Sequence, residues 1–220
     1  MLDLLIRLQD GFAVIISMVA VAIAASFIRK YCVDSFAVGW SIKASRFIDS
    51  KLTFIGVIHH EISHTLLAVL TGAKIKRFSL FNLTGDKLGE VIITTRGPKL
   101  LQSIQLTASA FAPVICGVFS IYYIGRYSLI GELEGLKGLG EIFDTIFVMS
   151  IAYHMTLSKQ DIKVAMRGII PTMALILIPF YYIDIDIYLY LNYTYDVFKL
   201  LGLNLIVASI FRVNSLVKRG

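Results

Sequence analysis

The sequence predicts an all-α polytopic membrane protein with five or six transmembrane helices and one small membrane-associated β-hairpin. Of its 220 residues, 57% are hydrophobic and only 16% are charged, and the mean hydropathy is +0.77. A soluble domain is about one-quarter charged, so this composition indicates a single integral membrane domain over residues 1–220. The basic residues behind the net charge of +6 gather at the ends of apolar segments. That placement is typical of topology anchors, and we expect no nucleic-acid partner.

Apolar runs of bilayer length define the expected helices, since about 20 residues are needed to cross the hydrocarbon. The candidate spans cover residues 11–28, 52–73, 100–125, 142–158, 168–191 and 197–211. The last run is the weakest because Lys199 interrupts it. With six spans and a cytoplasmic N-terminus, the larger share of the lysines and arginines falls on the inner side. This favours a multi-pass protein of the cell membrane with its N-terminus in the cytoplasm.

The segment from about 74 to 96 differs in residue pattern from the predicted spans around it. Two short runs, 74–81 and a β-branched 89–95, flank the turn signal Thr84-Gly85-Asp86. This pattern predicts a β-hairpin lying against the membrane, and a basic interfacial loop is the alternative. An exposed edge of such a hairpin can take up an unwound peptide, whose backbone groups must be satisfied where water is scarce.

The most specific motif lies inside the second span. His60, Glu61 and His64 form His-Glu-x-x-His, in which two imidazoles four residues apart share one helix face and can bind one zinc, with the glutamate as general base. A carboxylate at mid-span costs about 2.5 to 3.5 kcal/mol on insertion scales, so Glu61 is expected to have a partner or a function. His59 points about 100° away from His60 and is not expected to be a ligand. The plainer alternative is that these histidines only hydrogen-bond neighbouring helices.

The motif and its surroundings resemble the site-2 protease family of intramembrane zinc metalloproteases. The resemblance covers roughly the middle half of the chain. It comprises residues 60–72, the segment 76–80, Gly89-Glu90-Val91, and the small-residue helix Ala108–Gly117. It implies that His60 and His64 are zinc ligands, that Glu61 is the catalytic base and that the substrate is a membrane-embedded protein. The chain departs from the family in lacking an Asn-x-x-Pro stretch that ends in Asp-Gly.

A third zinc ligand must therefore come from elsewhere, because a catalytic zinc has three protein ligands and one open position. The nearest match to a divergent branch of the family is Leu157-Ser158-Lys159-Gln160-Asp161, which makes Asp161 the first choice and His154 the second. On a continuous helix the two would lie about 10 Å apart, so both reach one ion only if the helix breaks between them. The alternatives are a solvated loop carboxylate for Asp161 and a packing residue for His154.

Together these features predict an intramembrane zinc metalloprotease, a hydrolase that cleaves peptide bonds in or near membrane-spanning segments within the lipid bilayer. Two alternatives remain open. One is a zinc-binding membrane transporter or sensor, or a catalytically inactive protease homologue. The other is a membrane metalloprotease of the prenyl-protease type, which needs a downstream glutamate in a Glu-x-x-x-Asp setting; Glu141 and Asp144 have the wrong spacing for it.

Overall fold

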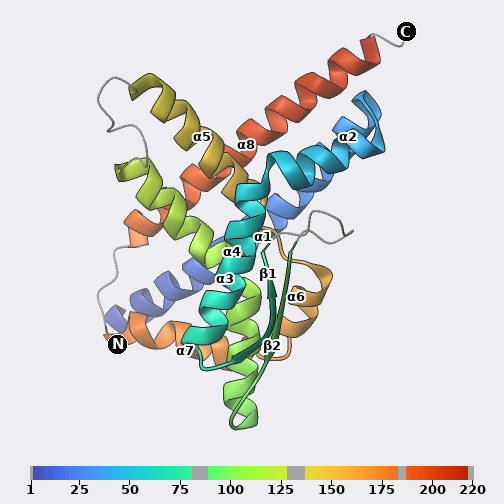
Figure 1. The fold of residues 1–220 in the computed structure, drawn as a ribbon. Helices are drawn as coiled ribbons and strands as arrows, with labels where there is room; N and C mark the ends of the chain where they lie inside the picture. The colour runs from blue at the N-terminus through green and yellow to red at the C-terminus, as the bar shows by residue number, and fades with distance from the viewer. Residues whose placement is uncertain (1, 81–88, 128–136, 183–186, 218–220) are drawn as a thin grey trace.

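The structure, a computed structural model, describes residues 2–80, 89–127, 137–182 and 187–217. Within these ranges the chain is mostly helical, with one two-stranded sheet (Figure 1). The elements in chain order are α1 (Leu2–Gly39), α2 (Ile42–Phe47), the π-helical turn η1 (Ile48–Leu52), α3 (Phe54–Leu70), β1 (Lys74–Ser79), β2 (Glu90–Thr94), α4 (Lys99–Tyr127), α5 (Lys137–Tyr153), α6 (Lys159–Ala165), α7 (Ile169–Tyr182) and α8 (Ile187–Val217).

Three of the described helices are long and apolar enough to cross a bilayer: α1 over Ile6–Gly39, α4, and α8 over Tyr190–Val217. The pair Ile42–Leu52 and Phe54–Leu70, bent by 58°, makes a fourth if it is one broken span. The helices α5 and α7, at 17 and 14 residues, fall below that length. The described residues thus give three span-length helices, or four with the bent pair, where the sequence predicts five or six.

One predicted span ends earlier in the structure than in the sequence prediction. The run 142–158 does not stay helical to its end, because α5 stops at Tyr153 and the next five residues connect it to α6. In the run 168–191, the described residues form α7 up to Tyr182 and α8 from Ile187 on, and residues 183–186 lie outside the described part of the chain. The predicted sixth run, 197–211, is therefore the interior of α8. A hydropathy average over the whole run 142–158 does not locate the end of α5 at Tyr153.

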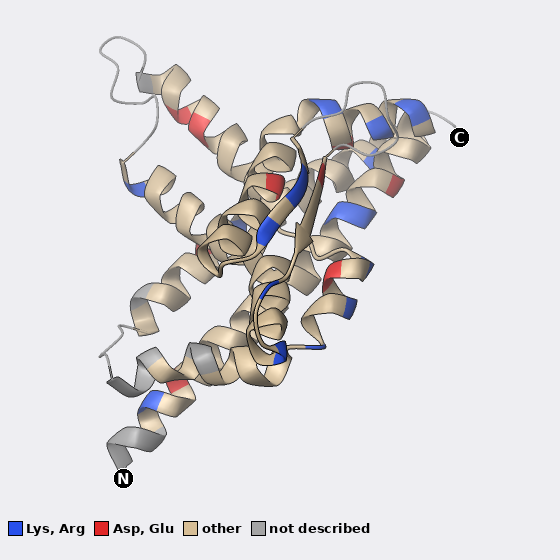
Figure 2. Cartoon of the chain, turned by 60° about the horizontal axis from the view of Figure 1, so that its bottom comes forward, with Lys and Arg blue, Asp and Glu red and all other residues tan. Residues whose placement is uncertain are grey.

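The predicted β-region contains an antiparallel pair, with Lys74 opposite Thr94 and Phe78 opposite Val91. The turn predicted at Thr84-Gly85-Asp86 lies outside the described residues. In Figure 2 the long helices are tan over most of their length, whereas charged residues are visible on the sheet. The sheet therefore combines charge with β-structure next to apolar helices, as the sequence predicts.

Gly72 turns the chain from α3 into this sheet. Its φ of +85° lies in the left-handed region that favours glycine. The Gly72 amide donates to the carbonyl of Val69 at 2.9 Å. The Ala73 amide donates to the carbonyl of Ala68 at 2.8 Å. These two bonds form a Schellman motif, which ends the histidine-bearing helix and places β1 directly beside it.

The main apolar core joins α1, α4, α5 and α8. Its fully buried members include Val21, Val114, Ile151 and Leu201, one from each of these helices. The helix α3 packs against α4 and α5, and the sheet packs against α3 (Figure 1). The histidine-bearing helix is therefore enclosed by helices on one side and by the sheet on another.

Candidate metal centre

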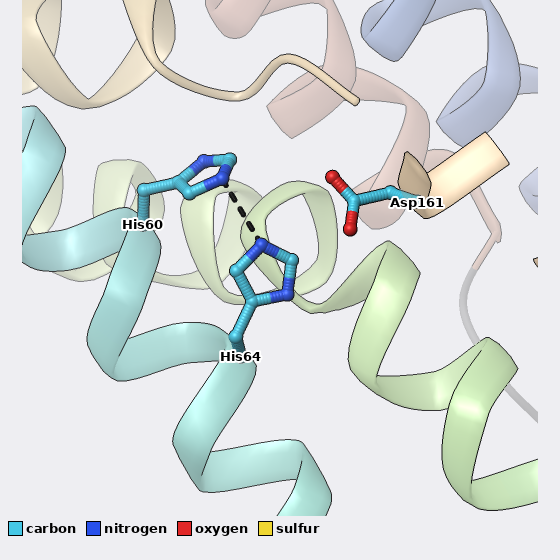
Figure 3. A group of neighbouring side chains, drawn as sticks. All are labelled: His60, His64 and Asp161. Carbon is cyan, nitrogen blue, oxygen red and sulfur yellow. Dashed lines mark hydrogen bonds between the residues drawn. The ribbon is translucent and has the colours of Figure 1, made fainter. Parts of the chain in front are cut away.

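The helix α3 presents His60 and His64 on one face, as four-residue spacing requires. Their Nε2 atoms lie 3.0 Å apart. The carboxylate of Asp161 approaches the same point from α6, and Figure 3 shows the two rings turned toward each other with this carboxylate facing them. The candidate ligand atoms of the three residues all lie within 4.8 Å of one another. Residues about 100 positions apart in the chain thus meet at one partly buried point.

Each imidazole is oriented by a backbone carbonyl. His60 Nδ1 lies 2.7 Å from the carbonyl oxygen of His154, and His64 Nδ1 lies 2.7 Å from that of Ser109. A carbonyl oxygen only accepts, so each Nδ1 carries the proton and donates it. In a neutral ring the Nε2 atom then holds a lone pair. The two Nε2 lone pairs are thus left facing each other without a proton between them.

A cation bound between the two Nε2 atoms would accept both of these lone pairs. Histidines that ligate a metal almost always donate their other ring N–H to a carbonyl, a carboxylate or water, which fixes both the tautomer and the ring orientation. Two imidazole nitrogens and one carboxylate oxygen form a donor set that suits zinc. The residues present therefore fit a zinc ion with three protein ligands.

Asp161 is positioned by the start of α6. It occupies the third position of the helix in a capping box with Ser158, the N-cap. The Ser158 amide donates to Asp161 Oδ2 at 2.9 Å, and the Asp161 amide donates to Ser158 Oγ at 3.1 Å. These bonds fix the direction of the carboxylate while using only one of its oxygens.

His154 lies outside this group. Its Nε2 atom is 2.8 Å from Thr53 Oγ1, and that hydroxyl donates its own proton to the carbonyl of Asp49 at 2.8 Å. Thr53 can therefore only accept from the histidine, so His154 donates through Nε2. The helix does break between His154 and Asp161, because α5 ends at Tyr153 and α6 begins at Lys159. Of the two candidates for third ligand, the structure brings Asp161 to the histidine pair, and His154 contributes its backbone carbonyl.

Glu61 lies beside the pair and in contact with the start of strand β2. A Cβ atom added to Gly89 would lie 2.9 Å from Glu61 Cδ and 3.0 Å from Glu61 Oε1. Only a residue without a side chain allows the backbone this close. Gly89 belongs to the Gly89-Glu90-Val91 stretch that carries part of the family resemblance, but nothing in its spacing predicts the contact with Glu61.

His59 faces away from the group, as predicted. Its Nε2 atom lies 2.9 Å from Ser120 Oγ of α4. Glu141 and Asp144, the residues nearest to a prenyl-protease ligand set, lie on α5 and are not part of the His60, His64 and Asp161 group. Among the residues predicted for the site, the structure thus collects His60, Glu61, His64 and Asp161.

The comparisons with known proteins add no family assignment. No family model matches the chain, and no curated protein or solved structure matches it.

Proposed function

We propose that this chain is a polytopic membrane protein of the site-2 protease type, a zinc metalloprotease that hydrolyses peptide bonds in or near membrane-spanning segments. The observation that carries the proposal is the geometry of one site. Two imidazoles with carbonyl-bound Nδ1 atoms face each other, Asp161 completes a three-residue donor set, and Glu61 lies on the same helix.

The exterior of the long helices supports the membrane setting. Large apolar side chains are exposed along α1 and α8, among them Phe27, Ile206 and Val207. Soluble monomers rarely expose apolar surface continuously along whole helices. In a bilayer these side chains contact lipid tails, and the helices satisfy their own backbone groups.

His60, His64 and Asp161 would hold the zinc ion. Three protein ligands are the number that catalytic zinc sites use, so the ion would still be able to bind water or substrate. A bound zinc supplies Lewis-acid chemistry, which makes water a stronger acid and polarises a peptide carbonyl. The carbonyls of His154 and Ser109 keep both rings in the tautomer that offers Nε2.

Glu61 is the proposed general base and acid. Its carboxylate accepts a proton from the attacking water and then donates it to the leaving amine of the cleaved peptide. With this mechanism, no serine or cysteine nucleophile is needed. The function also accounts for a carboxylate in the middle of an apolar helix, where a charge is costly.

The sheet provides a place for the substrate. Strand β2 begins at Glu90, next to Gly89 and Glu61. An unwound segment of a membrane-embedded protein that pairs with a strand edge satisfies its own backbone groups and lies extended near the catalytic base. A helical peptide bond is shielded by its hydrogen bonds, so cleavage needs such an extended form.

Metal removal tests the proposal directly. Treatment of the purified protein with a zinc chelator should abolish cleavage of a single-span substrate in detergent or liposomes, and added Zn²⁺ should restore it. Added Mg²⁺ should not, because it prefers oxygen ligands and binds imidazole poorly. Cleavage that continues in protein shown to be free of zinc would refute the metalloprotease.

Gly89→Ala tests the contact between the sheet and the base. The new methyl group would strike Glu61, so either the strand or the carboxylate must move. A displacement near 1 Å at a reacting group can cost up to about 100-fold in rate, and we expect cleavage to fall roughly tenfold or more with zinc content unchanged. Gly202→Ala on α8 is the matched control, since its Cβ would meet nothing within 4 Å. Equal cleavage by the two variants would contradict this arrangement of strand and base.

A further inference from the structure

The connection between α5 and α6, residues 154–158, helps to position two of the three candidate metal ligands. The carbonyl of His154 orients the His60 ring at 2.7 Å. Ser158, at the other end, caps the helix that carries Asp161. The relative position of these two ligands therefore depends on where this connection lies.

An ion pair from two other elements holds the connection. Arg29 of α1 donates two hydrogen bonds to Asp49 of η1 from one edge of its guanidinium group, Nε to Oδ1 and Nη2 to Oδ2, each at 2.9 Å. The Tyr153 hydroxyl donates to Asp49 Oδ1 at 3.0 Å, and Arg29 Nη1 donates to Thr156 Oγ1 at 3.4 Å. The guanidinium also lies 5.8 Å from the centre of the Tyr153 ring. The ion pair thus contacts the chain on both sides of His154, at Tyr153 and at Thr156.

The segment that carries Asp49 holds the His154 ring as well. Thr53 donates to the Asp49 carbonyl and accepts from His154 Nε2, each at 2.8 Å. The Ser150 hydroxyl donates to the Thr53 carbonyl at 3.1 Å, which ties this segment to the last turns of α5. His154 and Tyr153 are each only 4% exposed. The carbonyl that meets His60 is therefore fixed through its own ring and through both neighbouring stretches of chain.

Stability alone is a weak reason for such a pair. The side chains of Arg29 and Asp49 are 28% and 19% exposed, so both charges are largely withdrawn from water. For buried pairs the loss of hydration offsets much of the attraction, and apolar replacements are often neutral or stabilising. A planar, two-pronged Arg–carboxylate contact does supply geometric precision. The hydrogen bonds of this ion pair fix the α5–α6 connection, and that connection orients the metal centre.

We propose that Arg29 and Asp49 are positioning residues of the metal centre, which fix the α5–α6 connection so that the His154 carbonyl orients His60 and Asp161 comes within reach of the pair. The inference rests on the metal site proposed above. Neither residue touches the candidate ligands; both act through Tyr153, His154 and Thr156. Hydrogen-bond partners that orient metal ligands typically change metal affinity by about 10- to 100-fold when they are removed.

The test compares Arg29→Met, Asp49→Leu and the double variant with the wild type, as full-length proteins in detergent. Zinc affinity is measured by competition with a chromophoric chelator, and Tm by thermal unfolding. Each single variant leaves one buried charge without its partner, so both Tm and zinc affinity should fall. The double variant should recover Tm while its zinc affinity stays weakened by about 10- to 100-fold. If the ion pair only stabilised the fold, the double variant would recover both Tm and zinc affinity.

Two further variants complete the design. Asp196→Asn breaks the exposed 2.9 Å pair with Lys199 on α8 and should leave zinc affinity unchanged. Tyr153→Phe removes only the hydroxyl bond to Asp49 and should weaken zinc binding, though less than the double variant does. If the double variant does not fold, Tyr153→Phe serves as the test. Wild-type zinc affinity in the folded double variant, or in Tyr153→Phe in that case, overturns this inference alone. A wild-type protein that binds no zinc overturns both the inference and the metal site.

Discussion

Glu61→Gln should abolish cleavage of a co-expressed single-span substrate while leaving zinc bound. Glutamine has nearly the shape of glutamate but cannot take a proton from water, so the rate should fall by at least about 100-fold. The proposed ligands and their carbonyl partners do not involve the Glu61 side chain. Cleavage is followed by immunoblotting of the substrate and zinc by elemental analysis of the purified variant.

His59→Gln is the matched control, since it alters a neighbouring polar residue of the same helix that bonds Ser120 of α4. It should retain both zinc and most of the cleavage. The Glu61 variant also separates the competing functions. A zinc transporter or sensor should keep its full activity without a carboxylate at this position, whereas a protease cannot. Cleavage at the wild-type rate by Glu61→Gln would rule out the proposed mechanism.

The parts of the fold that sequence predicted best are those with local causes. The antiparallel strands 74–79 and 90–94 follow β-branched and turn signals within about 20 residues of chain. His60 and His64 share a face because a helix repeats every 3.6 residues, whatever surrounds it. Such features need no knowledge of the tertiary structure.

The end of α5 shows what local signals miss. The predicted span 142–158 includes residues 154–157, yet the chain leaves the helix after Tyr153. The visible causes are long-range: Asp49 binds the Tyr153 hydroxyl, Thr53 binds the His154 ring, and His60 uses the His154 carbonyl. A hydropathy average contains none of these contacts.

Sequence patterns also could not predict the groups that orient the ligands of the metal centre. Every residue has a backbone carbonyl, so no pattern distinguishes those of His154 and Ser109 from the rest. The sequence did suggest that Asp161 and His154 compete for one role. In the structure they have different ones, a carboxylate facing the histidine pair and a carbonyl behind one of its rings.

Because Asp161 and His154 have different roles, their variants should differ in zinc content. Asp161→Ala removes a proposed ligand and should weaken zinc binding by more than about 100-fold, beyond the loss typical of a group that only orients a ligand. His154→Ala keeps the backbone carbonyl that meets His60 and loses the ring, with its contacts to Thr53 and to the Tyr153 ring. It should therefore retain zinc with a smaller loss of affinity. Zinc stoichiometry and competition titrations measure both variants.

Asp161 also caps α6, so its removal has a structural effect that must be separated from metal binding. Loss of a capping side chain costs about 1 kcal/mol. Ser158→Ala removes the other half of the same capping box while leaving the Asp161 carboxylate in place. If Asp161 is a ligand, Ser158→Ala should show the loss of stability but bind zinc far more tightly than Asp161→Ala. If both variants lose zinc equally, the cap and not the carboxylate matters; if only His154→Ala loses it, the third ligand is the histidine.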